Sequence, residues 1–369
     1  MRIFGFLCAA VVLFGGLEAW AALTATELKR PTSFPHRIWV ACDFEGRTHT
    51  DYGWFGKVET NTIPKYPGNR TALRANPGAY GNHAAIMGGI NPVPGPRMGK
   101  ENWLYLRYFL KGGTDATLQH FSLTTEDNWH VNVGGLTTNA WADLAVNFTA
   151  HAKRNDGSAK GFGEGERMDD FKMFAGSPNE AATFELLMDD VLFFANNPAL
   201  PPEPEPFPKR VIFLAAFDTG EKEKYWPGDL TIVDDPPAGA YWKVARSVKK
   251  QSEMISLPLD PPRPVGARTK LRFRYHLTGA DQMTVQIFDA TVQDNRHVVL
   301  RGLAQNEWKT QYVDFSRDAR RNDGSANSEF TAGNLVDDIF FFVNSLDSRD
   351  SSPAPVLHLD EVVLFDAGG

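Results

Sequence analysis

An internal repeat constrains the fold of this chain more than any other feature. Residues 104–159 align with residues 271–326 without a gap, at an offset of 167, and 26 of the 56 positions are identical. The alignment continues on both sides with small shifts, so that Phe34 corresponds to Phe207. A period this long exceeds those of solenoid and propeller units, and it therefore indicates that one whole domain has been duplicated.

The repeat divides the 369 residues into four segments. Residues 34–196 and 207–367 are the predicted domains, and residues 197–206 between them are rich in proline and glutamate. Proline fixes φ and lacks an N–H donor, so we expect this linker to be an extended, semi-rigid spacer. Residues 1–21 have a positively charged start, an apolar stretch and an Ala-x-Ala site, which predicts a cleaved signal peptide. The alternative is a membrane anchor, but the apolar stretch is shorter than the roughly 20 residues of a span.

Within each copy, apolar and polar residues alternate with a period of two. Leu271, Phe273 and Tyr275 would share one face of a strand, with Arg274 on the other. Many short strands and turns also suit a composition with 12% aromatic residues, 32 glycines and 24 prolines. No window shows a sustained helical period with caps. The prediction is an all-β chain of two tandem antiparallel β-sandwich domains in jelly-roll form, because stacking two sheets buries one face of each.

Charge and cysteine content exclude several classes of protein. The formal net charge is −7, and no run of Lys and Arg longer than a pair is interleaved with aromatic residues, so we expect no binding to nucleic acid. Of the two cysteines, Cys8 lies in the predicted signal peptide, which leaves Cys42 without an internal disulfide partner. We expect a monomeric protein that is secreted, periplasmic or at the cell surface, with no membrane span.

The ends of the two copies share short motifs. The opening strands end in CDFEG at 42–46 and in AFDTG at 216–220, and the closing strands read LLMDDVL at 186–192 and LHLDEVV at 357–363. These motifs resemble the bracketing strands of galactose-binding-like jelly rolls, a fold shared by many non-catalytic carbohydrate-binding modules of secreted bacterial proteins. The resemblance covers nearly the whole of both copies. Families with different ligands share these motifs, so the resemblance indicates the fold better than the ligand.

The same resemblance implies a structural calcium ion in each domain, where the first and last strands meet. Calcium prefers several oxygen ligands at about 2.3–2.6 Å, which carboxylates on adjacent strand ends can supply. The candidate ligands are Glu45, Asp189 and Asp190 in the first copy and Asp218, Asp360 and Glu361 in the second. The alternative is that these acids cap strand ends or pair with a nearby arginine, such as Arg37 or Arg210.

Aromatic side chains are the predicted binding residues, because sugars present C–H faces that stack on rings beside polar groups. Core residues tend to match across a duplication, so rings that differ between the copies are predicted at the surface. Trp129 opposes Arg296 in this way, and Trp103 opposes Lys270. The predicted ligand-binding residues are Trp129, Trp54, Tyr52, Trp103, Trp226 and Trp242, with Arg107, Gln119 and Arg274 as hydrogen-bonding partners. The alternative for each ring is packing against an edge or a loop.

The sequence therefore favours a secreted protein that binds a polysaccharide without cleaving it, and no catalytic residue is assigned. Two sites on one tether would add avidity if both engaged the same polymer. One alternative is a jelly-roll polysaccharide lyase or glycoside hydrolase, for which Glu164, Glu166, Asp169 and Asp170 form the densest acidic group. A second alternative is a structural or adhesive cell-surface protein that uses the same sandwiches for protein contacts.

Overall fold

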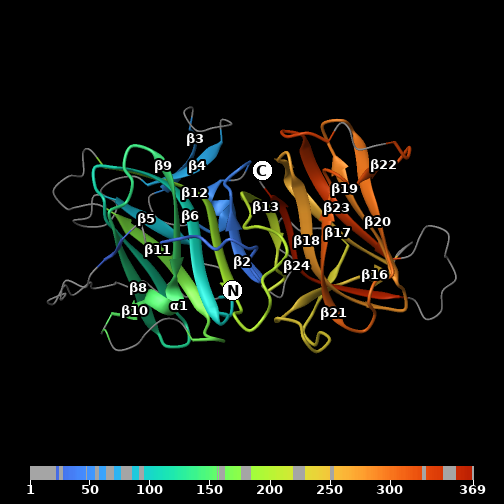
Figure 1. Cartoon of the computed structure of the whole chain (residues 1–369), viewed down its shortest axis with the longest axis horizontal. Helices are drawn as coiled ribbons and strands as arrows, with labels where there is room; N and C mark the ends of the chain where they lie inside the picture. Colours follow the sequence, from blue (N-terminus) through green and yellow to red (C-terminus); the bar gives the residue numbers. More distant parts are fainter. Residues whose placement is uncertain are drawn as a thin grey trace, which may run out of the picture.

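The computed structural model of the chain is built almost entirely of β-strands (Figure 1). It describes residues 22–24, 28–46, 48–54, 58–63, 70–75, 85–90, 95–155, 157, 163–175, 184–218, 229–249, 253–325, 330–343 and 355–367. Within these ranges the helical elements are α1 (Phe148–His151) and η1 (His49–Tyr52), and no helix is long and apolar enough to cross a membrane. The predicted signal peptide lies outside the described residues.

The first copy folds as two sheets of six strands each. Its distal sheet contains β1 (Leu23–Thr24), β5 (Ala85–Ile90), β7 (Ala116–Ser122), β8 (Asp127–Gly134), β10 (Lys153–Arg154) and β11 (Met168–Ala175). Its proximal sheet contains β2 (Arg37–Cys42), β3 (Val58–Thr62), β4 (Thr71–Ala75), β6 (Glu101–Lys111), β9 (Trp141–Asn147) and β12 (Glu185–Asn196). The orders are β1-β8-β7-β11-β5, with β10 on β8, and β3-β4-β12-β6-β9, with β2 on β12.

The second copy repeats this arrangement. Its proximal sheet contains β13 (Arg210–Ala215), β14 (Thr231–Val233), β15 (Val244–Arg246), β18 (Thr269–Thr278), β21 (Trp308–Asp314) and β24 (Val356–Asp366). Its distal sheet contains β16 (Val248–Lys249), β17 (Glu253–Pro264), β19 (Gln282–Asp289), β20 (Asp294–Arg301), β22 (Arg320–Arg321) and β23 (Leu335–Val343). The orders are β14-β15-β24-β18-β21, with β13 on β24, and β16-β17-β23-β19-β20-β22.

Side chains alternate between the two faces of each strand, and the apolar set of each sheet faces its partner sheet. In β19, Met283, Val285 and Ile287 are buried and lie in the core of the second copy, while the residues between them are half-buried on the opposite face. The first copy has an equivalent core of its own. Pairing between the described strands is antiparallel except for β1 with β8. The predicted fold class, tandem antiparallel β-sandwiches, is confirmed.

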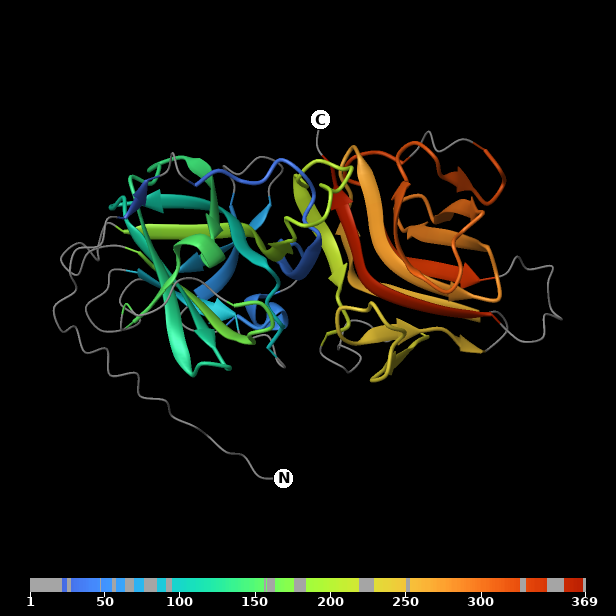
Figure 2. The same cartoon turned by 60° about the horizontal axis from the view of Figure 1, so that its bottom comes forward.

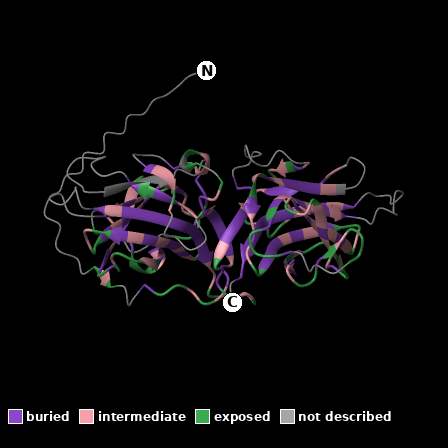
Figure 3. Ribbon diagram, turned by 90° about the horizontal axis from the view of Figure 1, so that it is seen from above, coloured by how far each residue is buried: buried purple, intermediate pink, exposed green. Residues whose placement is uncertain are grey.

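The four sheets form a stack along the long axis of the molecule, with the two proximal sheets in the middle (Figures 1 and 2). A third apolar cluster lies between the proximal sheets, where Figure 3 shows buried strands of the two halves meeting. This interface cluster comprises Phe34, Ile38, Tyr105, Ala145, Leu192 and Phe194 of the first copy and Phe207, Val211, Val363, Phe365 and Ala367 of the second. The copies therefore contact each other through the outward faces of their proximal sheets.

Corresponding residues meet at this interface. The corresponding pairs are Phe34 and Phe207, Ile38 and Val211, Leu192 and Val363, and Phe194 and Phe365. The equivalent strands β2 and β13 also lie against each other. In an isologous contact both partners use the same surface patch, and a two-fold axis relates the two partners.

Polar contacts across the interface break this symmetry. Arg37 of the first copy donates to Asp218 of the second at 2.7 Å, with both side chains about nine-tenths buried. Arg272 corresponds to Tyr105, and its guanidinium donates to the carbonyl of His36 at 2.9 Å. Because the contact is not fully symmetric, some equivalent positions have different surroundings and carry different side chains.

The proline-rich segment 197–206 is fixed against the second proximal sheet. Glu205 accepts from Lys270 at 2.8 Å, and Glu203 accepts from Arg272 at 3.1 Å. The backbone of Phe34 donates to the carbonyl of Glu205 at 2.7 Å. The segment is irregular, as expected for a spacer, but here it is docked beside a direct contact between the copies and does not hold them apart.

Candidate functional site

Trp129 and Trp54, two of the predicted ligand-binding residues, lie in the core of the first copy. Their exposed fractions are 3% and 2%. The ring of Trp54 packs against Phe44 and Phe171, with centroids 5.8 Å and 6.3 Å away. Neither ring can stack on a sugar, so the prediction that these two residues bind ligand is wrong.

Trp129 and Arg296 differ because each copy fills the same interior position in its own way. In the second copy the guanidinium of Arg296 lies 3.4 Å from the carboxylate of Asp289, and both side chains are fully buried. At the position of Asp289 the first copy has Ser122, so neither member of this ion pair is present in the first copy. Here, a mismatch across the duplication marks compensating changes in the core and not a surface position.

Trp103, Arg107 and Arg274 lie on the outward faces of the proximal sheets, where contacts within the protein engage them. Trp103 packs against the interface cluster. Arg107 lies 3.5 Å from the carboxylate of Asp143, and Arg274 lies 2.8 Å from that of Asp360. These side chains stabilise the fold and the contact between the copies.

Trp242 and Tyr52 contribute to the region where the copies meet. The ring centroid of Trp242, in the second copy, lies 5.1 Å and 5.4 Å from the guanidinium carbons of Arg97 and Arg167 in the first. Tyr52 donates its hydroxyl hydrogen to the buried carboxylate of Asp43 at 2.7 Å. Trp226, the remaining predicted ring, lies outside the described residues.

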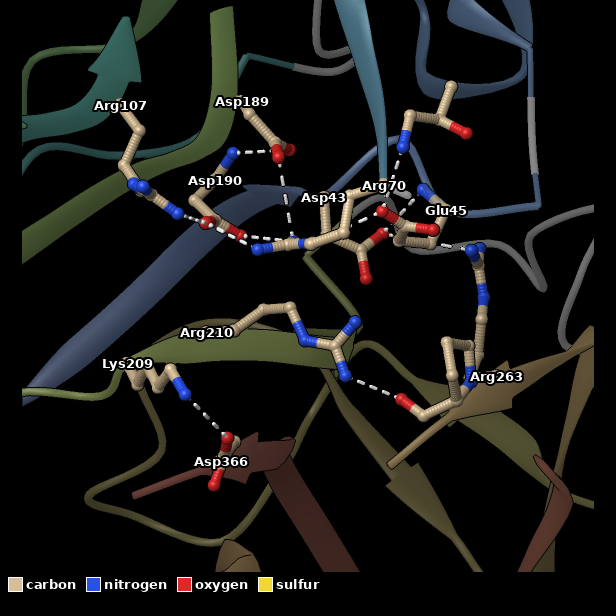
Figure 4. Close-up of polar contacts among 12 residues, drawn as sticks. Asp43, Glu45, Arg70, Arg107, Asp189, Asp190, Lys209, Arg210, Arg263 and Asp366 are labelled. Carbon is tan, nitrogen blue, oxygen red and sulfur yellow. Dashed lines mark hydrogen bonds and ion pairs between the residues drawn. The ribbon is translucent and has the colours of Figure 1, made fainter. Parts of the chain in front are cut away.

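The acidic residues predicted from the first copy do converge, but around an arginine (Figure 4). Arg70 donates to both carboxylate oxygens of Asp190, at 2.8 Å and 3.0 Å. It also donates to Glu45 at 3.2 Å and lies 3.6 Å from Asp189. The guanidinium supplies the positive charge that the sequence prediction assigned to calcium.

In the second copy each of the corresponding carboxylates also faces a guanidinium. The closest nitrogen–oxygen distances are 2.7 Å for Asp218 with Arg37, 2.8 Å for Asp360 with Arg274 and 3.2 Å for Glu361 with Arg272. Burial raises the pKa of Asp360 to about 7, and it outweighs the opposing effect of Arg274. Arg37 belongs to the first copy, so this cluster joins the copies by charge as well as by apolar packing.

The outward face of the second distal sheet brings together rings and hydrogen-bonding side chains that face away from the core. Cross-strand pairing places three rows side by side. The rows are Asp338, Phe288 and Asn295; then Phe340, Gln286 and His297; then Phe342, Thr284 and Val299. We call these nine residues the second distal face; all are half-buried except Val299, which is 44% exposed.

Contacts within the second distal face preorganise it. The rings of Phe340 and Phe342 stack, with centroids 5.7 Å apart and planes 16° from parallel. Gln286 donates to the side-chain oxygen of Asn295 at 2.9 Å. Burial, together with the neighbouring Asp337, raises the pKa of Asp338 to about 6, so this group is mostly ionised at neutral pH and accepts hydrogen bonds.

The first distal sheet presents a matching face. The first distal face comprises Asp170, Phe121 and Asn128, then Lys172, Gln119 and His130, then Phe174, Thr117 and Asn132. Seven of its nine residues are identical in the second copy. The identical pairs are Thr117 and Thr284, Gln119 and Gln286, Phe121 and Phe288, Asn128 and Asn295, His130 and His297, Asp170 and Asp338, and Phe174 and Phe342. Of the described residues predicted to bind ligand, Gln119 is the one that lies on a distal face.

Sequence reasoning overlooked these faces, although a signal was present. Gln119, Phe121 and His130 occupy strand positions that alternate with buried residues, and each is identical in the other copy. A residue that faces away from the core has no packing reason to stay the same. Identity between the copies at outward positions would therefore have been a better criterion than difference between them.

The cavity beside His120 is too small for a sugar. It is lined by Trp39, Met98, Asn102, Trp103, His120, Phe148, Met168 and Phe193, and its volume is about 10 Å³. That volume is comparable to one water molecule. This cavity is therefore not a candidate sugar site.

Comparison with known proteins gives similarity to solved structures alone. No family model matches the chain, and no curated protein matches its sequence. The tandem CBM22-1–CBM22-2 domains of Paenibacillus barcinonensis Xyn10C are 12% identical, over 92% of this chain and 100% of that chain, with a TM-score of 0.32. The tandem CBM51 modules of Sp3GH98, a family 98 glycoside hydrolase from Streptococcus pneumoniae, are 9% identical over 94% and 99%, with a TM-score of 0.24. TmCBM61, solved with β-1,4-galactotriose, is 16% identical over 41% of this chain and 94% of that chain, with a TM-score of 0.27.

The arrangement of the acidic residues does not fit a calcium ion. Calcium binds six to eight oxygens, whereas Glu45, Asp189 and Asp190 surround a guanidinium. Across the described part of the chain, no three His, Cys, Asp or Glu side chains are grouped as a metal site.

We therefore expect the midpoint of thermal unfolding to be the same in calcium chloride and in EDTA. The arginine partners already neutralise the buried carboxylates, so a cation would have to displace a guanidinium before it could bind. Differential scanning calorimetry of the full chain measures this midpoint, with magnesium chloride as the control. A rise of the midpoint with calcium but not with magnesium would contradict the expectation.

Proposed function

We propose that the chain binds carbohydrate on its two distal faces, without cleaving it. The observation that carries this proposal is the retention, in both copies, of the same outward-facing phenylalanine, glutamine, asparagine, threonine and histidine. Packing does not require these identities, because the buried partners of these residues lie on the opposite face of each strand. The predicted signal peptide, residues 1–21, would place this binding outside the cell.

The chemistry of the distal faces suits sugars. A pyranose ring has apolar C–H faces and polar edges, so it needs exposed rings flanked by donors and acceptors. On the second distal face, Phe288, Phe340 and Phe342 supply rings, and Gln286 and Asn295 supply amides. Amides both donate and accept, which matches the hydroxyl groups of a sugar.

The two faces differ at their centres. Lys172 of the first copy occupies the position of Phe340, and its ammonium lies 3.0 Å from the carboxylate of Asp170. The second face therefore has the longer set of rings, and the first face has a charged pair at the same place. We expect the second face to bind neutral polysaccharides more tightly than the first.

Replacing Phe340 by alanine should weaken binding of the full chain to its polysaccharide about tenfold, which corresponds to about 1.4 kcal/mol. The reason is the loss of one ring at the centre of the second distal face. Affinity electrophoresis in gels containing soluble xylan, β-1,4-galactan, hydroxyethyl cellulose or dextran measures the retention. Thr310→Ala, at an exposed position on the second proximal sheet, is the matched control and should leave retention unchanged.

Two results would overturn the proposed function. Absence of retention in all four gels would show that the faces do not bind these glycans. A rise in reducing ends, or in ultraviolet absorbance from an unsaturated product, would show an enzyme and not a binding protein. Equal retention of Phe340→Ala and the unsubstituted chain would move the site away from the second distal face.

A further inference from the structure

We propose that this protein cross-links two separate glycan strands, because its two distal faces point in opposite directions. The inference rests on the proposed function and concerns what two such sites can do together. Sequence reasoning expected both sites to engage one polymer and to gain avidity. The order of the four sheets leads to the opposite arrangement.

The two distal faces lie at opposite ends of the stack of sheets. The proximal sheets contact each other through the interface cluster, and each distal sheet lies on the far side of its own copy (Figures 1 and 2). The outward faces of the distal sheets are therefore the two ends of a four-layer stack. With about 10 Å between packed sheets, the distal sheets are separated by about 30 Å.

The contact between the copies holds this orientation. Besides the apolar cluster, charged groups from both copies pair where they are buried: Arg37 with Asp218 at 2.7 Å and Arg263 with Asp43 at 3.7 Å. The backbone N–H of Ile38 also donates to the carboxylate of Glu361. Turning one copy so that both distal faces pointed the same way would break these ion pairs and expose the interface cluster to water, which is unfavourable.

One bound polymer cannot easily reach both distal faces. A glycan strand lying on one distal face would have to leave it, pass around all four layers of sheet and return in the opposite orientation to reach the other face. A glycan strand that stays extended cannot make such a reversal across a stack whose distal sheets lie about 30 Å apart. Two strands, one on each face, meet no such constraint, so one molecule joins two strands.

Turbidity of polysaccharide-coated beads tests the proposal. Four sets of latex beads, coated with xylan, β-1,4-galactan, hydroxyethyl cellulose or dextran, are mixed with the full chain, and the bound protein is measured on the same samples. We expect aggregation with every coating that retains the protein, and loss of aggregation at a large excess of protein, when every glycan site is filled singly. Retention without aggregation would overturn cross-linking and leave the proposed function standing, whereas no retention on any coating would overturn both.

Variants of a single face make the test specific. Phe121→Ala/Gln119→Ala alters the first distal face, and Phe340→Ala/Gln286→Ala alters the second; each should still be retained on the beads but should no longer aggregate them. Thr310→Ala is the control, which should both be retained on the beads and aggregate them. Circular dichroism and the unfolding midpoint verify that each variant is folded.

Mixing the two single-face variants separates cross-linking by one chain from self-association. If each molecule bridges by itself, the mixture stays clear, because neither variant has two working faces. Restored aggregation in the mixture would mean that copies of the chain associate with each other, and this result would overturn the proposal.

Discussion

Replacing Arg296 by methionine is expected to lower the free energy of unfolding by about 3–5 kcal/mol. Arg296 and Asp289 are both fully buried in the second copy, with 3.4 Å between nitrogen and oxygen. Methionine has a similar length but no charge, so the substitution leaves the carboxylate of Asp289 in the core without its cation. The side chain of Asn334, which donates to the same carboxylate at 2.8 Å, cannot neutralise it.

The first copy suggests the compensating change. Trp129 and Ser122 occupy the positions of Arg296 and Asp289. Arg296→Trp combined with Asp289→Ser therefore gives the second copy the two uncharged residues that the first copy has at these positions. We expect this double variant to be more stable than Arg296→Met, because it removes both charges together. Urea unfolding measures both free energies. A loss below about 1 kcal/mol for Arg296→Met would show that the ion pair does not matter for stability.

An exposed pair provides the control for this comparison. Arg317 pairs with Asp318 at 2.7 Å, but its side chain is 74% exposed. Arg317→Met should leave the unfolding midpoint unchanged, since water solvates either charge after the pair is broken. The contrast between two arginine–aspartate pairs isolates burial as the cause.

Replacing His120 by isoleucine should remove about 3 kcal/mol of acid destabilisation between pH 7.5 and pH 4.5. Burial lowers the pKa of His120 to about 3, because its ring packs among Phe148, Phe171 and Phe193. The unfolded chain takes up a proton near pH 6.5 and the folded chain does not, so stability is lost as the pH falls below 6.5. Ile287 occupies this position in the second copy, which shows that the fold accepts isoleucine there.

Other buried groups titrate over the same range, so the measurement is a difference between two proteins. Burial raises the pKa of Asp360 to about 7 and that of Asp338 to about 6, and such carboxyls stabilise the fold as the pH falls. They are common to the unsubstituted chain and to His120→Ile, and they cancel when the two pH dependences are subtracted. Urea unfolding of both proteins at each pH provides the four free energies. Identical pH dependences would show that His120 does not cause the acid destabilisation.

The fold class could be predicted because period-two alternation reports one buried face per strand. The contact between the copies was missed, although β12 carried a signal of it. The sequence Leu186–Ala195 is apolar at nearly every position, and all ten residues are buried. A strand with two apolar faces is covered on both sides, and in this chain the second cover is the other copy.

The candidate site was harder to predict, because the argument assumed that difference between the copies marks the surface. Tyr105 and Arg272 differ because one copy's proximal sheet meets the other's in a contact that is not fully symmetric. Trp129 and Arg296 differ because the cores compensate internally. Neither cause can be read from an alignment of two copies, since both depend on which side chains share a space. The calcium prediction likewise located the carboxylates correctly but could not place Arg70 among them.

The isologous patch between the proximal sheets also has a bearing on how such a chain arose. A protein with one copy would expose Phe34, Ile38, Leu192 and Phe194 together, and a self-complementary apolar patch closes as a two-fold dimer. Joining two subunits by residues 197–206 makes that association independent of protein concentration. Fusion would also let the halves diverge, as at the equivalent positions of Tyr105, which packs on Phe207, and Arg272, which donates to the carbonyl of His36.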